Sequence, residues 1–432
     1  MLNEATLHFV SRHTHDDVRV LALRGCKEPG VDLTLALQQI QGRQTARRKL
    51  PAWAATDGIV YPPHLNMEQC SSEFTARYKA RLARGLLSDA QGARCSTGTQ
   101  GADCRPDGRS GRLVDLTGGF GVDFAFMSEA FAEAVYVERD ASLCEIAAHN
   151  FKVLGLDSVA TLCADADAFF DSAHAASLCT GTASGPLLVF LDPARRDNHG
   201  GRTYALSDCT PNVVTMMPAL AARADSVMLK LSPMLDWRKA MADLAPHCVS
   251  QVHIVAVDNE CKELLLLLTR SADKLTLTCA DINSRDGSCS RYSPRLDGGA
   301  AAGTGPTDSC ASPAYLYEPN AAVMKAGCFG SLSADFGVVP LAANSHLFTA
   351  SRHVAAFPGR CFRIETTCSM NKRELRTAIA QLRQANIAVR NFPLTAEQLR
   401  ARLKLADGGD DYIFATTLKD NSHRLFLCKA CR

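Results

Sequence analysis

Short apolar runs alternate with helix-length stretches through the middle of the chain. Runs of this length between helical spacers are typical of strands in a doubly wound α/β sheet. Residues 112–272 contain seven of them, which predicts a Rossmann-like sheet of seven strands. The runs are Leu113–Val114, Ala134–Val137, Thr161–Ala166, Leu187–Leu191, Val227–Pro233, Val252–Val257 and Leu264–Thr269.

A glycine-rich turn follows the first run. The segment Asp115–Gly121 reads DLTGGFG, and a helix-compatible run extends from Val122 to Ala134. Glycine permits positive φ and close approach of the backbone to a ligand. The second predicted strand ends in Glu138, about 20 residues past the glycines, where nucleotide-binding folds place an acid on the ribose hydroxyls. The pattern predicts a nucleotide cofactor, but position 124 is phenylalanine, so the dinucleotide fingerprint GxGxxG is incomplete.

The N-terminal part, residues 1–111, is predicted to be helical and to end in a disordered linker. Helices are expected at Val31–Ile40 and Phe74–Leu87. Residues 88–111 are rich in small and polar residues and lack an apolar period, and residues 273–312 contain a second low-complexity patch, Asp297–Gly305. Such composition is typical of linkers or insertions.

Beyond the second linker, residues 313–360 are predicted to form a compact segment and residues 361–432 a small α+β module. Strand-like and helix-like patterns alternate along the module. Its expected elements are strand Cys361–Glu365, helix Lys372–Ala385, strand Ile387–Arg390, helix Thr395–Leu403 and strand Tyr412–Thr416.

Charge is unevenly distributed along the chain, although the net charge is only +2. Residues 1–112 contain 16 Lys or Arg against 11 Asp or Glu, and residues 371–432 contain 12 against 6. The two ends are basic and the middle is acidic, which suits a polyanionic substrate bound by flanking domains around a catalytic unit. Ordinary solvated helix faces explain the same distribution equally well.

The 18 cysteines are scattered through the chain rather than arranged as a compact disulfide framework. No hydrophobic signal sequence opens the chain and no apolar run is long enough to cross a bilayer. We therefore expect reduced cysteines and a cytoplasmic protein that does not enter membranes. Cys428 and Cys431 form a CxxC pair, but no second pair completes a zinc motif, so no metal is expected.

The glycine turn resembles motif I of class I S-adenosylmethionine (SAM) methyltransferases, with Thr117 in place of the first glycine. The resemblance implies that Thr117 and the backbone of Gly118, Gly119 and Gly121 line the methionine end of SAM. It further implies that Asp115 holds the ammonium group, that Glu138 binds the ribose diol, and that Asp165 and the amide of Ala166 read the adenine. For each acid the alternative is a strand-end residue that caps the next helix.

The fourth run ends in Asp192-Pro193-Ala194-Arg195-Arg196, where these methyltransferases keep their catalytic motif IV. Enzymes that methylate exocyclic nitrogens usually have Asp/Asn-Pro-Pro-aromatic there, so Asp192 and Pro193 match and the stacking aromatic residue is missing. Asp192 is the predicted proton acceptor or orienting group. Arg195, Arg196 and Lys230 are predicted to grip the substrate, since arginine can stack on a base or hold a phosphate. Lys230 could instead pair with Asp192 or Asp197.

The chain is similar, over nearly its whole length, to class I SAM-dependent methyltransferases with a C-terminal THUMP-like domain. This resemblance implies a methyltransferase domain at 112–272, a ferredoxin-like segment at 313–360 and a THUMP-like domain at 361–432. The matching peptides are GRQTARRKLPAW (42–53), IVYPPHLNMEQCSSEFTARYKA (59–80), VDLTGGFGVD (114–123), FLDPARRD (190–197), GGRTYALSDCTPNV (200–213), MLKLSPMLD (228–236), YLYEPNAAVMKAG (315–327) and RNFPLTAEQLRARLKLADGGDDYIFATTL (390–418).

By analogy with THUMP domains, the resemblance makes RNA the expected partner. The predicted activity is SAM-dependent methylation of a base nitrogen in tRNA or rRNA. No cysteine lies beside Asp192, which argues against the covalent route to C5 of pyrimidines. Two alternatives stay open: a small-molecule or protein methyltransferase, and an RNA-binding protein that no longer turns over.

Overall fold

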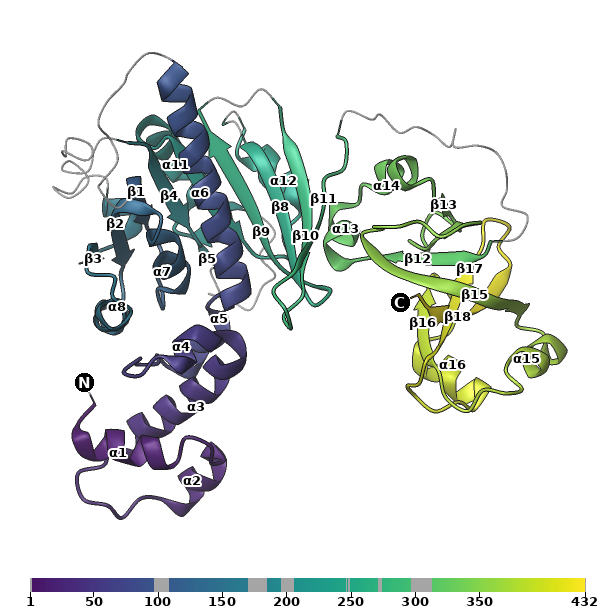
Figure 1. Cartoon of the computed structure of the whole chain (residues 1–432), viewed down its shortest axis with the longest axis horizontal. Coiled ribbons are helices and arrows are strands. Elements are labelled where there is room, and N and C mark those ends of the chain that lie inside the picture. The colour runs from purple at the N-terminus through teal and green to yellow at the C-terminus, as the bar shows by residue number, and fades with distance from the viewer. Residues whose placement is uncertain are drawn as a thin grey trace. The chain divides into compact units, whose positions relative to one another are not determined.

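The computed structural model describes residues 2–96, 109–169, 185–195, 206–245, 247, 249–270, 274–296 and 313–431. The chain forms two compact units (Figure 1). The first comprises Met1–Val252 and Glu263–Leu275, and the second comprises His253–Lys262 and Thr276–Arg432.

The first unit begins with helices, as predicted. Asn3, Asp17 and Asp32 each accept a hydrogen bond from a first-turn amide, which fixes the starts of the first three. The last helix is longer than the predicted Phe74–Leu87 and runs into the expected linker, of which residues 97–108 lie outside the described part. The helices are α1 (Glu4–Arg12), α2 (Val18–Arg24), α3 (Leu33–Lys49), α4 (Pro51–Ala55), α5 (His64–Gln69) and α6 (Glu73–Ser96).

A mixed sheet follows, with the strand order β11-β10-β8-β9-β7-β4-β1-β2-β3. Strand β1 lies between β2 and β4 and is parallel to both. The strands are β1 (Ser110–Asp115), β2 (Phe131–Glu138), β3 (Val159–Cys163), β4 (Leu187–Leu191), β7 (Ser226–Leu231), β8 (Val249–Val257), β9 (Glu260–Thr269), β10 (Thr276–Ile282) and β11 (Cys289–Tyr292).

The elements between these strands are helices and one small ribbon. Helix α7 lies against α6, beside the sheet (Figure 1). The connecting elements are α7 (Val122–Ser128), α8 (Ala141–Val153), α9 (Ala166–Phe169), the ribbon strands β5 (Ala194–Arg195) and β6 (Cys209–Thr210), the 3-10 turn η1 (Leu206–Asp208), α11 (Val213–Arg223) and α12 (Trp237–Asp243).

All seven predicted strands are present in this sheet, but two details differ from the expectation. Strands β10 and β11 extend the sheet, and they lie in the segment 273–312 that was expected to be a linker. The helix expected at Val122–Ala134 ends at Ser128, since Phe131 already pairs with Ser110 of β1. In both places long-range strand pairing outweighs local composition.

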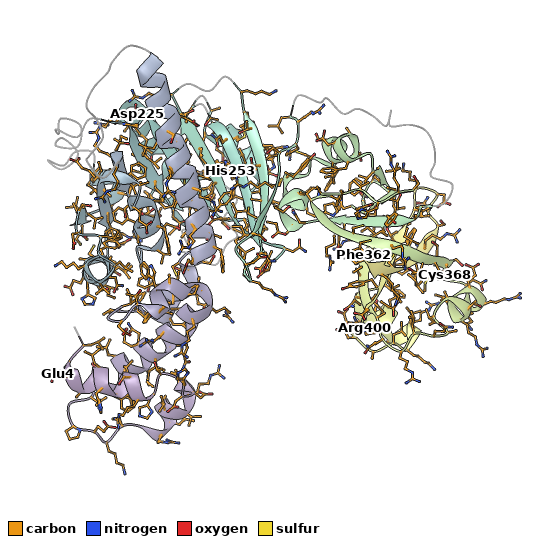
Figure 2. All side chains as sticks on the ribbon, in the orientation of Figure 1. Glu4, Asp225, His253, Phe362, Cys368 and Arg400 are labelled. Atoms are coloured by element: carbon orange, nitrogen blue, oxygen red, sulfur yellow. The ribbon has the colours of Figure 1, made fainter. Side chains whose placement is uncertain are left out.

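The second unit contains a sheet of order β13-β14-β12-β15-β18-β17-β16. Phe362 and Cys368 lie on the same strand, β15, and belong to two different apolar clusters (Figure 2). The elements are β12 (Tyr315–Pro319), α13 (Ala321–Ala326), α14 (Phe329–Phe336), β13 (Val339–Pro340), β14 (Phe348–Ala350), β15 (Gly359–Ser369), α15 (Lys372–Ala378), β16 (Asn386–Arg390), α16 (Ala396–Leu403), β17 (Asp411–Thr417) and β18 (His423–Ala430).

The predicted α+β pattern from residue 361 onward is confirmed, with one helix shorter than expected. Helix α15 ends at Ala378 instead of Ala385. Ala385 donates a backbone hydrogen bond to Ala406 at 3.0 Å, and Ala406 donates one to Arg383 at 3.0 Å. This bridge draws the chain into an extended form and ends the helix early.

Candidate active site

Predicted site residues gather at one edge of the first unit's sheet. The chain passes from β1 to β2 on one side, whereas β4 pairs with β1 on the other. Ligands of open α/β sheets bind at such a switch point, beyond the carboxyl ends of the strands. Asp115 ends β1, Glu138 ends β2 and Asp192 follows β4. The fold therefore brings three of the predicted acids to the same edge.

The glycine turn is closely packed and accepts only glycine at two positions. A Cβ atom at Gly118 would lie 2.1 Å from Tyr136, and one at Gly121 would lie 2.8 Å from Phe151. Gly121 also has a φ of 83°, in the left-handed region. The Tyr136 hydroxyl donates a hydrogen bond to the carbonyl of Gly119. These contacts fix the backbone of the turn.

Thr117 has a structural reason to replace glycine. Its Oγ1 accepts a hydrogen bond of 2.6 Å from the backbone N–H of Asp192. Its own N–H donates to Asp115 Oδ1 at 2.9 Å. Thr117 thus ties the end of β1 to the segment after β4, and a glycine would lose that tie.

Asp115 is a buried acid surrounded by other acids. Its side chain is almost fully buried, and Thr117 is the backbone donor to it. Burial raises the pKa of Asp115 well above its ordinary value, and the nearby carboxylates of Asp123, Asp192 and Glu138 raise it further. A cation placed beside Asp115 would reverse this effect, so the electrostatics favour a positively charged ligand group here.

Glu138 and Asp165 are both engaged with backbone amides. Glu138 Oε2 accepts from Gly119 N–H and Oε1 from Asp140 N–H, each at 2.9 Å. Each carboxylate oxygen keeps a second lone pair that can accept a hydroxyl. Asp165 is exposed and accepts from Asp167 N–H at 3.1 Å, at the start of α9, where Ala166 is buried. The capping role weighed for these acids is therefore present for Asp165, whereas Asp140 caps the helix that follows Glu138.

Lys230 forms an ion pair with Asp192. Lys230 Nζ contacts Asp192 Oδ2, and Asp123 Oδ2 lies 4.0 Å from the same nitrogen. Burial lowers the pKa of Lys230, but the charges of Asp192, Asp123 and Glu263 outweigh it and leave the pKa above its usual value. Lys230 therefore stays protonated beside Asp192. One of the two pairings predicted for this lysine is confirmed.

Beneath this pair lies a buried network that the sequence did not reveal. Lys79 on α6 donates to both oxygens of Glu263 on β9, at 2.6 and 2.7 Å. Lys79 also lies 3.3 Å from Asp123 Oδ1, and Ser71 Oγ donates to Asp123 Oδ2 at 2.7 Å. Asp123 joins this network to Lys230. The paired residues Lys79 and Glu263 are 184 positions apart, so no local motif could have linked them.

The N-terminal helices also contact the glycine turn. Phe120 packs edge-on against Trp53 of α4, with ring centroids 5.0 Å apart. Asn150 of α8 is fully buried, and its side chain exchanges two hydrogen bonds of 2.9 Å with the backbone of Val60. The N-terminal region is therefore part of the wall around the turn. The aromatic residue inside the glycine motif was the available signal for this contact.

The structure describes only some of the residues that were predicted to bind the substrate. Pro193 is buried, and the backbone of Arg195 lies in β5, which pairs with β6. The Arg195 side chain, Arg196 and Asp197 lie outside the described residues.

The C-terminal part of the chain matches two family models. Residues 315–358 match a ferredoxin-like domain and residues 359–430 match the THUMP domain-like family. The chain therefore carries the two C-terminal domains that its sequence resemblance implied.

Two known proteins extend the comparison to the rest of the chain. An uncharacterized SAM-dependent methyltransferase of Mycobacterium tuberculosis is 26% identical over 306 residues, covering 68% of this chain and 75% of the relative. A crystal structure from Porphyromonas gingivalis W83, described as a candidate methyltransferase, is 28% identical, with a TM-score of 0.79 over 100% of both chains. The whole chain thus shares its fold with that protein, and the resemblance to methyltransferases is confirmed.

No helix in the described part of the chain has the length and apolar character needed to cross a membrane.

Proposed function

We propose that the chain is a SAM-dependent methyltransferase that modifies a base nitrogen of RNA. The observation that carries the cofactor assignment is Asp115, a buried acid with a raised pKa at the switch point of the sheet. Acidic groups surround this carboxylate, and the ammonium group of SAM would place a positive charge beside it. The glycine turn beside it is packed so closely that Gly118 and Gly121 leave no room for a side chain.

The remaining cofactor contacts follow from the same edge. The amides of Gly118, Gly119 and Gly121 and the segment around Thr117 face the methionine end in this proposal. Glu138 accepts the ribose hydroxyls through its free lone pairs, and Asp165 with the Ala166 amide accommodates the adenine. When bound, SAM supplies a methyl group on a sulfonium sulfur, which an aligned nucleophile attacks.

Asp192 is the proposed orienting group for the methyl acceptor. Its carboxylate is half-exposed and held by Lys230 on one oxygen, while its backbone is held by Thr117. With one oxygen held by Lys230, the other oxygen of Asp192 accepts a hydrogen bond from the target N–H in this proposal. The nitrogen–methyl bond forms as the sulfur–methyl bond breaks, and the nitrogen's proton passes to Asp192 or to water.

RNA is the proposed acceptor because the THUMP-like domain accompanies two basic chain ends. A polyanion gains affinity from clusters of Lys and Arg. A small-molecule or protein acceptor, or binding of RNA without turnover, is an outcome of the test below.

The cofactor is tested by titrating S-adenosylhomocysteine into the purified chain and into Asp115→Ala. We expect micromolar binding that the variant loses and that Asp57→Ala, at an exposed position of the same unit, retains. The acceptor is tested with radiolabelled SAM and RNA from a deletion strain. Label in that RNA but not in parental RNA supports the proposal, and label in protein or metabolite fractions instead rejects RNA. Cofactor binding without any label would indicate a protein that no longer turns over.

A further inference from the structure

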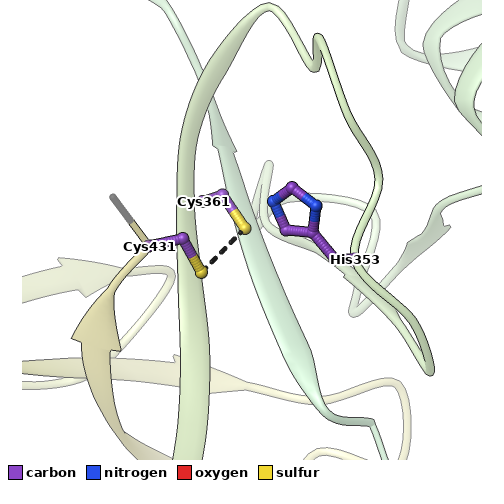
Figure 3. Close-up of side chains that lie close together, drawn as sticks. All are labelled: His353, Cys361 and Cys431. Carbon is purple, nitrogen blue, oxygen red and sulfur yellow. Dashed lines mark hydrogen bonds between the residues drawn. The ribbon is translucent and has the colours of Figure 1, made fainter.

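Three potential metal ligands lie together in the second unit, although one of them is 70 residues beyond its nearest neighbour in the sequence. They are His353, Cys361 and Cys431, whose ligand atoms all lie within 4.8 Å of one another. Cys361 Sγ and Cys431 Sγ are 3.2 Å apart, and the His353 ring faces them (Figure 3). None of these residues belongs to the active-site proposal above.

The cluster differs from the CxxC pair that the sequence offered. Cys428 is buried in the apolar cluster of Phe362, Phe414 and Phe426, so it is not available as a ligand. Cys431 instead lies beside Cys361, 70 residues earlier in the chain.

Each ligand comes from a separately fixed segment. Cys361 lies on β15, and Cys431 follows β18, whose Ala430 pairs with Phe362. The backbone N–H of Cys431 donates to the carbonyl of Cys361 at 2.9 Å, which fixes the two residues side by side. The strand ladder therefore holds both sulfur atoms on one side of the sheet.

His353 lies on the loop between β14 and β15. The N–H of its neighbour Val354 donates to the Tyr317 hydroxyl at 2.7 Å. The ring of Tyr315, on β12, meets the His353 ring edge-on at 5.6 Å between centroids. Tyr317 also pairs with Cys361 in the strand ladder. The same residue therefore positions both Cys361 and the loop that carries His353.

We propose that His353, Cys361 and Cys431 bind a zinc ion. Two thiolates and one imidazole are ligands that select zinc over harder cations such as magnesium. Zinc holds two thiolates at about 2.3 Å each in a tetrahedral arrangement, which places the sulfur atoms about 3.8 Å apart. The observed separation of 3.2 Å requires only a small opening of the pair.

The fourth coordination position belongs to water, because His353 is exposed and the two cysteines are half-buried. The bound ion joins three parts of the chain: the ferredoxin-like domain, which contains His353, the start of the THUMP-like domain, which contains Cys361, and the residue after it, Cys431. A zinc ion here fixes the C-terminal end of the chain against β15.

The test is the zinc content of the full chain, purified under reducing conditions, then dialysed against zinc and freed of excess. We expect about one zinc ion per chain, and almost none in Cys361→Ser/Cys431→Ser. His353→Ala should lose most of the zinc without unfolding, because this side chain is exposed on a loop. Cys289→Ser, a matched control on β11 of the same unit, should keep the full amount.

A second measurement separates zinc binding from a cysteine pair that merely oxidises. Cobalt(II) added to the reduced chain should give a thiolate charge-transfer band that zinc abolishes and that Cys361→Ser/Cys431→Ser never shows. Zinc content equal in wild type and this double variant overturns the proposal. So does a reduced wild type that takes up no metal while the air-exposed chain forms a Cys361–Cys431 disulfide.

Discussion

The two units bury charged side chains in different ways. In the first unit both partners of the Lys79–Glu263 pair are withdrawn from water, with 0% and 2% of their side chains exposed. In the second unit Glu318 is only 6% exposed, but its partners Arg360 and Arg390 are 51% and 40% exposed. We call the network of Lys79 and Glu263 the dry network. We call the buried Glu318 with its two solvent-exposed arginines the hydrated network.

This difference indicates different purposes. Removing two charges from water costs several kcal/mol per ion, and their attraction offsets it only with good geometry. The dry network lies directly behind the Lys230–Asp192 pair, to which Asp123 connects it. Glu318, in contrast, joins β12 to β15 and β16 and contacts no residue of the proposed active site among its described partners. We interpret the first network as one that positions the Lys230–Asp192 pair of the proposed active site. We interpret the second network as one that stabilises the sheet of the second unit.

The largest expected effect comes from breaking the dry network. Lys79→Met leaves Glu263 buried without its cation, so the first unit should lose about 3–5 kcal/mol of its free energy of unfolding. Both tryptophans of the chain, Trp53 and Trp237, lie in the first unit, so tryptophan fluorescence during urea unfolding measures this effect. Lys79→Met/Glu263→Leu should recover much of the loss. If the free energy of unfolding of Lys79→Met is within about 1 kcal/mol of the wild-type value, the network is not withdrawn from water.

The next effect should appear in activity rather than stability. Asp192→Asn keeps the shape of the side chain but removes the charge that Lys230 holds and the acceptor proposed for the substrate proton. We expect methyl transfer to fall about 10²–10³-fold, as for the loss of one positioned polar group, with S-adenosylhomocysteine affinity retained. Single-turnover methylation measures the rate and calorimetry the affinity. An equal loss of both would place Asp192 in cofactor binding instead.

A buried neutral histidine gives the second unit a dependence on pH. His253 lies on β8 (Figure 2), where burial and the charge of Arg291 lower its pKa to about 4. The unfolded chain, with a histidine pKa of about 6.5, binds the proton more readily, so stability is lost as pH falls from about 6.5 to 4. The contribution lost by pH 5 is about 2 kcal/mol.

The variant His253→Gln separates this effect from general acid denaturation. Unfolding followed by circular dichroism between pH 7 and pH 5 should show a smaller decline for the variant than for wild type, by about 2 kcal/mol. Identical slopes would mean that His253 is already charged in the folded chain.

The sequence predicts local features of this fold better than distant ones. Strand β4 was predicted with its observed bounds, Leu187–Leu191, because it is a continuous apolar run between turn residues. Strands β10 and β11 were missed because the glycine-rich patch at 297–305 led us to assign the whole segment 273–312 to a linker, although β10 itself alternates apolar and polar residues. The two groupings that matter most for chemistry, Lys79 with Glu263 and Cys361 with Cys431, join residues 184 and 70 positions apart. Such pairs depend on tertiary structure and leave no periodic signal.

The smallest effect should come from the hydrated network. Glu318→Gln keeps the shape and one acceptor oxygen, and water can solvate Arg360 and Arg390 because both side chains are about half exposed. We therefore expect a loss of about 1 kcal/mol, measured by circular dichroism, with the tryptophan transition of the first unit unchanged. Arg363→Gln breaks the exposed Arg363–Glu365 pair of the same strand and should change nothing measurable. If Glu318→Gln instead costs as much as Lys79→Met, the arginines are not effectively hydrated, and the distinction between a dry and a hydrated network does not hold.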